Sequence, residues 1–302
     1  MKQILVTGSS GFIGKELFHF LDKSQFKLIP FSHQDMNTYL HKNELLPAQW
    51  LSEIYGIINL AGVSISQRWN KKTKALILES RLNTTRFLVD SLQHAKDSQS
   101  PTPSVFINAS AIGYYGISPQ GIQTEEVPPG NDFLATVCRQ WEEAALQADR
   151  LGVRTVICRF GVVLGSSGGA LPRMALPFHW GVGGPIGDGS QYMSWIHIKD
   201  LLQALQLALT SNSMKGSYNF TSPHPVRMKQ FAVSLGKQLK KPVWLRLPGA
   251  AAKVLLGEMA EAILLADQQV LPQRLLKAGF QFQFPDLANA LADLYPDSKT
   301  QE

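Results

Sequence analysis

The chain opens with MKQILVTGSSGFIG, residues 1–14, and the rest of the sequence can be arranged around this stretch. Residues 2–7 form an apolar run that predicts a short buried strand, and a helical pattern follows the three glycines. Gly8 permits a tight turn, Gly11 lets the backbone approach a ligand, and Gly14 lets the helix pack close to the strand. A strand, a glycine turn and a helix in this order are typical of a site for the pyrophosphate of a dinucleotide.

The exposed N–H groups in the first turn of such a helix attract an anion. An ordinary glycine-rich turn is the alternative, but the position directly after an N-terminal strand favours the cofactor. The residues of this stretch that we expect at the cofactor are Gly8, Ser10, Gly11, Phe12, Ile13 and Gly14.

The second predicted strand covers residues 27–31, and its end indicates which dinucleotide is preferred. An NAD site usually has Asp or Glu at this end to bind the ribose 2′-hydroxyl. Here the strand is followed by Ser32 and His33, and no acid occurs before Asp35. A hydroxyl and an imidazole suit a 2′-phosphate better than a carboxylate would. The sequence therefore favours NADP over NAD, unless His33 is only an exposed loop residue.

A third apolar strand, residues 56–62, ends in small residues that would let a cofactor lie across the sheet edge. We expect Leu60, Ala61 and Gly62 at this edge. The long helical pattern over residues 69–95 follows, with Arg81 between apolar neighbours. This arginine either reaches the cofactor or forms a structural ion pair.

Further strands are predicted over 105–110, 154–160 and 216–220, with a helix over 133–151 between the first two. Closely spaced alternation of strands and helices indicates an α/β fold with a Rossmann-type, doubly wound parallel sheet. Residues 181–189 contain five glycines and are interpreted as a mobile segment and candidate lid.

The domain division follows from the change of pattern after Gly165. We expect a dinucleotide-binding domain over 1–165, to which 195–222 return. Residues 166–194 and 223–302 would form a smaller, mainly helical domain of substrate type, with a pocket between the two.

Composition narrows the classes of function. Of 302 residues, 44% are hydrophobic and 17% are charged, which suits a globular protein. The net charge of +6 and the pI of about 9.2 favour anionic ligands. No basic run or known module points to nucleic acid, and no stretch suggests a membrane span. Two cysteines without metal-ligand spacing, and a strand that begins at residue 2, lead us to expect a cytoplasmic protein without a metal.

Several motifs together resemble the extended short-chain dehydrogenase/reductases, which include nucleotide-sugar epimerases and dehydratases. The chain is most similar to an atypical "epimerase family" branch of that class, and the resemblance covers nearly the whole chain. It also implies that Gly161 and Val162, after the strand over 154–160, lie at the cofactor. The motifs are TGxxGxxG at 7–14, NLAG at 59–62, DFLA at 132–135, WE at 141–142, RFGVVLG at 159–165, WIHIKD at 195–200, GEM at 257–259 and LPxRL at 271–275.

The resemblance implies catalysis by Ser or Thr, Tyr and Lys, with Tyr-x-x-x-Lys on one helix. This chain has Leu134 where the class has Tyr and Cys138 where it has Lys. An adjacent cation is needed to lower the pKa of a phenol from its ordinary value near 10. The remaining candidates for catalysis are Ser110, Tyr114 and Tyr115, which lie at the end of the strand expected to face the nicotinamide.

Two functions follow from this pattern. The first is an NADP-dependent oxidoreductase or epimerase with a non-standard active site, acting on a nucleotide sugar or another small hydroxyl or keto compound. The second is a cofactor-binding protein without turnover that senses NADP(H) or acts through a partner. The oligomeric state does not follow from the sequence.

Overall fold

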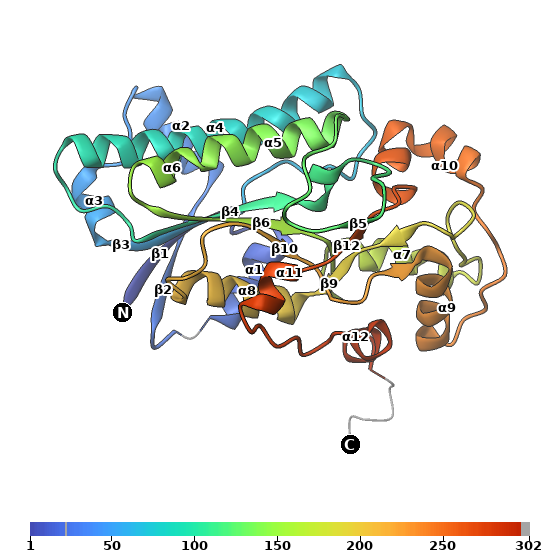
Figure 1. The fold of residues 1–302 in the computed structure, drawn as a ribbon. Coiled ribbons are helices and arrows are strands. Elements are labelled where there is room, and N and C mark those ends of the chain that lie inside the picture. Colours follow the sequence, from blue (N-terminus) through green and yellow to red (C-terminus); the bar gives the residue numbers. More distant parts are fainter. Residues whose placement is uncertain (22, 297–302) are drawn as a thin grey trace.

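The computed structural model describes residues 1–21 and 23–296, and its centre is a six-stranded parallel sheet. The strand order is β10-β6-β4-β3-β1-β2, with β1 beside β2 on one side and β3 on the other (Figure 1). This order confirms the Rossmann-type doubly wound sheet. The strands are β1 (Lys2–Thr7), β2 (Phe26–Phe31), β3 (Ile54–Asn59), β4 (Val105–Ala111), β6 (Arg154–Phe160) and β10 (Gly216–Phe220).

Side chains alternate between two hydrophobic clusters along each strand. In β1, Ile4 and Val6 belong to one cluster, whereas Leu5 belongs to the other. In β4, Phe106 likewise faces the second cluster and Ile107 the first. Since both faces are buried, the strands read as continuous apolar runs rather than as alternating patterns.

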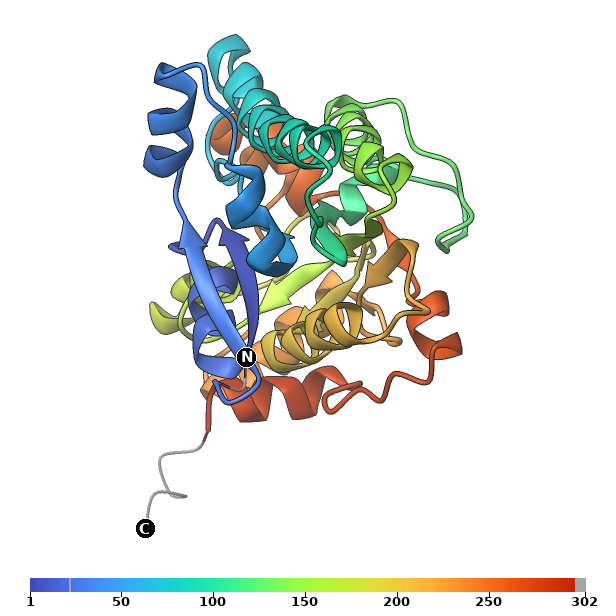
Figure 2. The ribbon, with the colours of Figure 1, turned by 90° about the vertical axis from the view of Figure 1, so that its left-hand side faces the viewer.

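Helices cover both faces of the sheet (Figures 1 and 2). The predicted helix over 133–151 is divided at Leu146 into two helices. The helices on one face are α2 (His33–His41), α3 (Ala48–Glu53), α4 (Lys71–Asp97), α5 (Phe133–Ala145) and α6 (Gln147–Arg150). The helices on the other face are α1 (Phe12–Phe20) and α8 (Ile198–Thr210).

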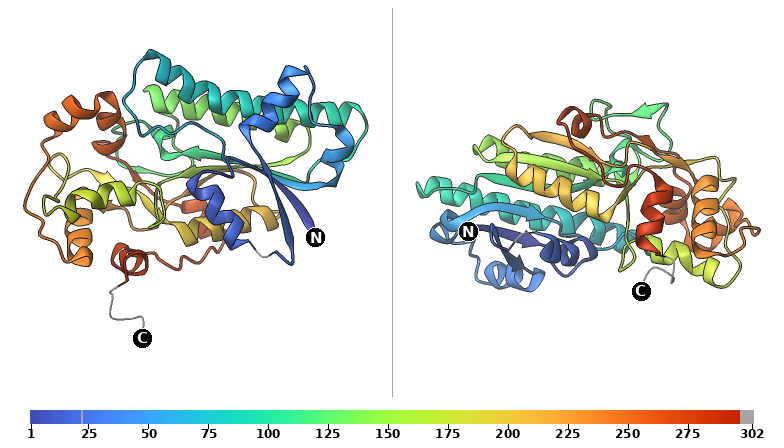
Figure 3. Two further views of the ribbon diagram at one scale, coloured as in Figure 1. Left: turned by 180° about the vertical axis from the view of Figure 1, so that it is seen from behind. Right: turned by 90° about the horizontal axis from the view of Figure 1, so that it is seen from below.

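A smaller lobe lies at the end of the molecule away from the N-terminus (Figure 3). Its helical part consists of α7 (Leu171–His179), α9 (Met228–Leu239), α10 (Gly249–Leu256) and the π turn η2 (Ala260–Leu264). Three two-stranded pairs lie between the lobe and the main sheet. They are β7 (Val162–Leu164) with β9 (Trp195–His197), β8 (Tyr192–Met193) with β11 (Val226–Arg227), and β5 (Ile122–Gln123) with β12 (Gln269–Val270).

Helix α11 (Gln273–Lys277) packs against β10 of the main sheet. Helix α12 (Leu287–Leu294) packs against α9 of the smaller lobe and is joined to α8 by an ion pair between Asp293 and Lys199 at 2.7 Å. The guanidinium of Arg274 donates to the backbone oxygen of Ser217 at 2.7 Å, next to β10. The carboxylate of Asp200, in the first turn of α8, accepts the backbone N–H groups of residues 283 and 284. The smaller domain expected over 223–302 therefore contains a segment held by the larger one, and its residues 297–302 lie outside the described residues.

The middle of the glycine-rich segment 181–189 is packed against neighbouring chain, whereas a β-carbon at Gly181 would meet nothing within 4 Å. A β-carbon at Gly183 would lie 2.3 Å from the ring of Phe178, and one at Gly184 would lie 1.7 Å from the backbone oxygen of Leu245. The N–H of Gly187 donates to the backbone oxygen of Leu247 at 3.0 Å. Close approach of neighbouring chain explains glycine at 183 and 184. Within the described residues, no helix is both long and apolar enough to cross a membrane.

Candidate cofactor and substrate site

Two of the three glycines in the N-terminal turn are required by packing. Gly8 has a φ of +67°, and a β-carbon there would lie 2.6 Å from the backbone oxygen of Leu60. A β-carbon at Gly14 would lie 2.4 Å from the backbone oxygen of Gly8. The turn, the start of α1 and the end of β3 therefore meet without room for side chains.

Gly11 has a different environment. It is exposed, its φ of −73° is open to any residue, and a β-carbon there would meet only the oxygen of Gly8, at 3.2 Å. It is the N-cap of α1, and no side chain caps this helix. The first N–H groups of α1 thus face open space beside an exposed Ser10, which is the geometry that an anion requires. Ile13 is partly buried and packs against the core.

The side chain of Phe12 packs inside the protein. Its ring lies against the loop that follows β7, where β-carbons at Gly165, Gly168 and Gly169 would come within 2.4–3.0 Å of it. Phe12 therefore fixes the start of α1 against this loop, and only its backbone remains for the cofactor.

At the end of β2, Ser32 is the N-cap of α2 and forms a capping box with Asp35. The Ser32 hydroxyl donates to the Asp35 carboxylate at 2.7 Å. The imidazole of His33 is exposed and its Nδ1 lies 3.1 Å from the amide nitrogen of Asn37. Ser32 thus has a structural role that the sequence pattern did not indicate.

Asn59 clamps the ends of three strands. This buried side chain accepts from Thr7 of β1 and donates to Asn108 of β4 at 2.7 Å and to Thr85 of α4 at 2.8 Å. The clamp holds the loop over 60–62 beside the glycine turn.

Arg81 of α4 lies over this loop. Its guanidinium donates to the backbone oxygens of Ile77 at 2.9 Å and Val63 at 3.1 Å, and a β-carbon at Gly62 would lie 3.0 Å from it. Burial lowers the pKa of Arg81, and the nearby Cys138 thiol acts in the opposite direction. Among the described residues Arg81 has no carboxylate partner. It is a half-buried cation beside the loop after β3, and the described residues contain no ion pair of Arg81.

Ser110 belongs to a buried charged network. Its hydroxyl donates to the carboxylate of Glu142 at 2.6 Å, and Arg159 binds the same carboxylate through two nitrogens at 2.8 and 2.9 Å. Burial alone would lower the pKa of Arg159, but the bonds to Glu142 raise it above the ordinary value. The network joins β4, α5 and β6, and sequence reasoning did not identify it.

The two candidate tyrosines, both in the 3₁₀ turn η1 (Ile112–Tyr115), differ in their surroundings. Tyr115 is 3% exposed; its hydroxyl donates to Asn219 at 2.7 Å and accepts from Arg159 at 3.0 Å. Burial raises the pKa of Tyr115 to about 12, against the influence of Arg159. Tyr114 is partly buried, and the guanidinium carbon of Arg159 lies 3.4 Å from its ring centre. Burial also raises the pKa of Tyr114.

Leu134 and Cys138 face η1 from α5. A β-carbon at Gly113 would lie 3.3 Å from Leu134 and 3.8 Å from the sulfur of Cys138. Burial raises the pKa of the Cys138 thiol to about 12, so it stays protonated near neutral pH. An apolar pair therefore stands where the resemblance implies a tyrosine and a lysine.

A cavity of about 790 Å³, here called the inter-lobe cavity, lies between the sheet edge and the smaller lobe. Its wall on the sheet side includes Ile112, directly after β4, and Val162, the first residue of β7, two residues after the end of β6. Gly161 beside it packs against Ser194, to whose oxygen a β-carbon would come within 2.8 Å. Tyr114 and Tyr115 are not among the described residues that line this cavity.

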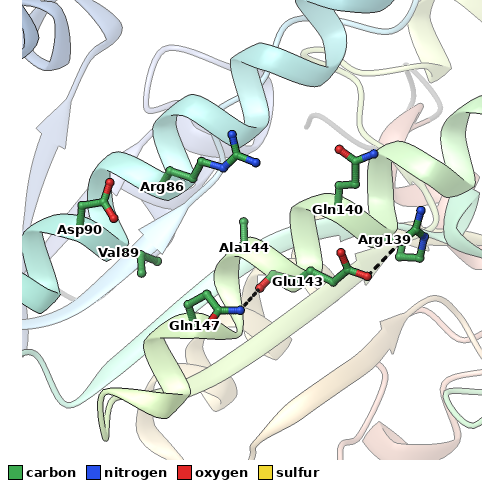
Figure 4. A pocket seen from close by; sticks show the side chains of 8 residues that line it. All are labelled: Arg86, Val89, Asp90, Arg139, Gln140, Glu143, Ala144 and Gln147. Atoms are coloured by element: carbon green, nitrogen blue, oxygen red, sulfur yellow. Dashed lines mark hydrogen bonds and ion pairs between the residues drawn. The ribbon is translucent and has the colours of Figure 1, made fainter.

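A second hollow, of about 520 Å³, lies between α4 and α5 (Figure 4). Its lining is mostly polar and charged, and it includes none of the predicted cofactor or catalytic residues: Arg86, Val89, Asp90, Arg139, Gln140, Glu143, Ala144 and Gln147. Over the residues that the structure describes, no three His, Cys, Asp or Glu side chains gather in a way that could hold a metal ion.

Comparisons with known proteins show which proteins this chain resembles. Residues 247–294 match a domain of unknown function, DUF1731. An Arabidopsis thaliana protein, the chloroplastic epimerase family protein SDR39U1 homolog, is 40% identical over 95% of this chain and 85% of its own length. Epimerase family protein YfhF of Bacillus subtilis is 37% identical over 98% of this chain and 99% of its own.

A solved structure extends the likeness to three dimensions. The crystal structure of human epimerase family protein SDR39U1 (isoform2) with NADPH has a TM-score of 0.86 and 32% identity, and the match covers 97% of this chain and 99% of that one. Residues 4–220 match the model of one family over the whole parallel sheet. The chain therefore belongs to the NAD dependent epimerase/dehydratase family.

Proposed function

We propose that this protein is an NADP(H)-dependent oxidoreductase or epimerase that acts on a hydroxyl or keto compound bound in the inter-lobe cavity. One observation carries the proposal: the cavity starts at Ile112 and Val162, at the same sheet edge as the glycine turn. In doubly wound folds this edge takes the dinucleotide. A substrate in the cavity would then lie next to the nicotinamide.

NADP(H) is proposed as the cofactor because residues near the glycine turn suit its phosphate groups. The uncapped start of α1 at Gly11 would take the pyrophosphate, and Arg81 would add a cation near Gly62. His33 keeps an exposed imidazole for a 2′-phosphate. The NADPH in the human relative supports NADP(H) as the cofactor, which supplies or accepts the hydride.

For the proton, Tyr114 is the stronger of the two candidates. The hydroxyl of Tyr115 is held between Asn219 and Arg159, and that of Ser110 is held by Glu142. Tyr114 is less buried, and the cation of Arg159 on its ring acts to lower the pKa that burial raises. We propose Tyr114 as the general acid. It follows the cavity-lining Ile112 by two residues, and its hydroxyl would turn into the cavity when the substrate binds.

The test has two stages. Calorimetric titration with NADPH and NADH measures whether the cofactor binds and which form binds more tightly. NADPH oxidation is then followed at 340 nm across a panel of aldehydes, ketones and nucleotide-4-keto sugars. Tighter NADPH binding and turnover of at least one compound are expected; binding of neither cofactor would refute the proposal.

The pair Leu134 and Cys138 favours a second candidate, an NADP(H)-binding protein without turnover. Such a protein would bind NADPH as tightly but oxidise it with none of the compounds. Cofactor-dependent capture of a protein partner, absent for the variant Gly11→Val, would then distinguish a sensor from an enzyme whose substrate is missing from the panel.

A further inference from the structure

Flexible apolar side chains form much of the wall of the inter-lobe cavity. Four of the seven methionines of the chain line it: Met174, Met193, Met228 and Met259. Phe178 and Phe231 complete much of the remaining apolar surface. Methionine adapts its shape to a ligand more readily than branched residues do. A cavity of about 790 Å³ with such a wall suits a sizeable apolar body.

The charges at the cavity are of one sign. Its ionisable lining residues, within the described chain, are Arg68, Arg173, Arg246 and the phenol of Tyr192, and no acid or lysine is among them. Arg173 donates to the backbone oxygen of Ser66 at 3.3 Å, and Arg246 donates to that of Gly187.

These arginines are exposed, and none of the three forms an ion pair within the described residues. The charge of Arg246 reaches Asp188, whose carboxylate accepts instead from the N–H and hydroxyl of Ser190. The cavity therefore has an apolar interior and cations without a matching acid.

The deeper polar groups of the wall are already bonded within the protein. The Ser194 hydroxyl donates to the backbone oxygen of Gln268 at 2.9 Å and accepts from the N–H of Val270 at 2.8 Å. The side-chain amide of Gln268 donates to the backbone oxygens of Ile112 and Gly116. These groups are not left over to bind a nucleobase or sugar hydroxyls, whose burial without partners is costly.

From these contacts we propose that the cavity binds an anionic amphiphile, an apolar chain or ring system with one carboxylate or phosphate group held by Arg173 and Arg246. The proposal rests on the proposed function, since it names the substrate class of the same site. The acid group lies at the arginines and the apolar body lies against the methionines. A carbonyl or hydroxyl along that body then reaches the sheet edge at Val162.

The first experiment uses the neutral dye N-phenyl-1-naphthylamine, which fluoresces in apolar sites, with the full chain saturated with NADPH. Decanoate, decyl phosphate, decanol and UDP-glucose are added separately, each below its micelle concentration. Decanoate or decyl phosphate is expected to displace the dye at concentrations about ten-fold lower than decanol, which is the effect of a charged hydrogen bond at a partly exposed site. Comparison of the two acids tells a carboxylate site from a phosphate site.

Variants test whether Arg173 and Arg246 cause the preference for the acids over decanol. Arg173→Gln combined with Arg246→Gln should reduce the preference for the acids over decanol to about two-fold or less, with dye binding unchanged. Arg86→Gln, on the hollow between α4 and α5, is the control and should keep the full preference. These arginines are exposed, so all the variants are expected to fold.

The outcomes separate the two proposals. Equal displacement by decanol and the acids, or displacement by UDP-glucose at lower concentration than by either acid, overturns the amphiphile. A preference that survives in the double variant overturns the assignment to Arg173 and Arg246. A separate titration of the same protein preparation with NADPH, without the dye, reports on the proposed function independently. Bound NADPH without acid preference refutes only the inference.

Discussion

At the scale of single residues, glycine occurs at the three positions of the N-terminal turn for different physical reasons. Gly8 and Gly14 are enclosed by backbone, so any side chain collides with the protein itself. Gly11 is exposed and has room for a side chain apart from one contact at 3.2 Å. The fold therefore does not require glycine at this position, and we propose that the cofactor does.

Gly11→Val is expected to abolish NADPH binding and leave the fold intact. The branched side chain would occupy the space in front of the uncapped N–H groups of α1. Gly14→Val is the matched control, because its side chain would overlap the oxygen of Gly8 and cost about 1–3 kcal/mol of stability or more. Circular dichroism and NADPH fluorescence on the same samples measure both effects. Wild-type affinity in Gly11→Val would place the cofactor elsewhere.

The two tyrosines are expected to respond differently to removal of the hydroxyl. Tyr115→Phe leaves the side-chain oxygen of Asn219 and one nitrogen of Arg159 without their bond to the phenol, and should cost about 1–3 kcal/mol of unfolding free energy. Tyr114→Phe should cost little stability but, once a substrate is known, about 10²–10⁴ in rate. Urea unfolding and steady-state kinetics test this pair.

Cys138→Ser serves as the control in the same kinetics, because its buried thiol stays protonated. Full activity in both tyrosine variants would exclude a phenol as the proton donor. Loss of activity in Cys138→Ser alone would point to the thiol instead.

At the scale of elements, Glu142 connects α5 to the sheet through its ion pair with Arg159 of β6. Glu142→Gln removes the charge that compensates the buried Arg159, and loss of one partner of such a pair costs about 3–5 kcal/mol. Its neighbour provides the control, since Glu143 forms an exposed pair with Arg139 at 3.2 Å, and Glu143→Gln should change stability by less than about 0.5 kcal/mol. Equal midpoints of the two variants in urea would contradict a stabilising role for the network.

The junction of β9 and α8 makes stability depend on pH. His197 is fully buried, and burial lowers its pKa from 6.5 to about 4, although Asp293 lies 3.3 Å away and favours the charged form. Lys199, the other charge at this junction, disfavours it. The unfolded chain binds this proton at higher pH than the folded chain does. The contribution of His197 to the free energy of unfolding is therefore fully present above pH 6.5. It decreases as the pH falls towards 4, by about 3 kcal/mol.

Thermal unfolding between pH 7 and pH 4 measures this loss. His197→Gln should have a flatter dependence of Tm on pH than the wild type, whatever its Tm at pH 7. His179→Gln, at the exposed end of α7, should keep the wild-type dependence. An identical slope in His197→Gln would show that other groups cause the acid sensitivity.

At the scale of the whole molecule, the proposed cofactor site lies where several parts of the chain meet. The glycine turn contacts the loop after β3, and Phe12, which follows the turn, contacts the loop after β7. A ligand bound there stabilises the folded state by mass action, by about 2.7 kcal/mol at one hundred times its Kd. For a chain of this length, NADPH should raise Tm by roughly 5 °C.

NADH at the same concentration is expected to raise Tm less, since Ser32 and His33 take the place of an acid at the end of β2. Differential scanning fluorimetry with both cofactors measures the two shifts. An equal or larger shift with NADH would contradict the preference for NADP(H). Gly11→Val should show no shift with either.

Sequence patterns predicted the six strands of the main sheet and their order along the chain. Apolar runs as short as residues 154–160 marked buried strands, because a strand covered on both faces needs no polar side. The glycine turn predicted a cofactor site at this edge, because few backbones other than a strand-to-helix turn require glycine at this spacing. The boundary within 133–151 was missed, since helical periodicity continues across Leu146 while the hydrogen bonding changes.

Only the tertiary structure decided what the polar residues do. The sequence makes Ser110 and Tyr115 candidate catalytic residues. In the structure their hydroxyls are hydrogen-bonded to Glu142 and Arg159, which are distant from them along the chain. The cavity and its arginines come from segments more than one hundred residues apart, such as Arg68 and Arg246. Local patterns report backbone conformation and burial, whereas the partner of a buried charge depends on which elements pack together. The physical reason is that hydrogen bonds and ion pairs act over a few ångströms in space, whatever the separation along the chain.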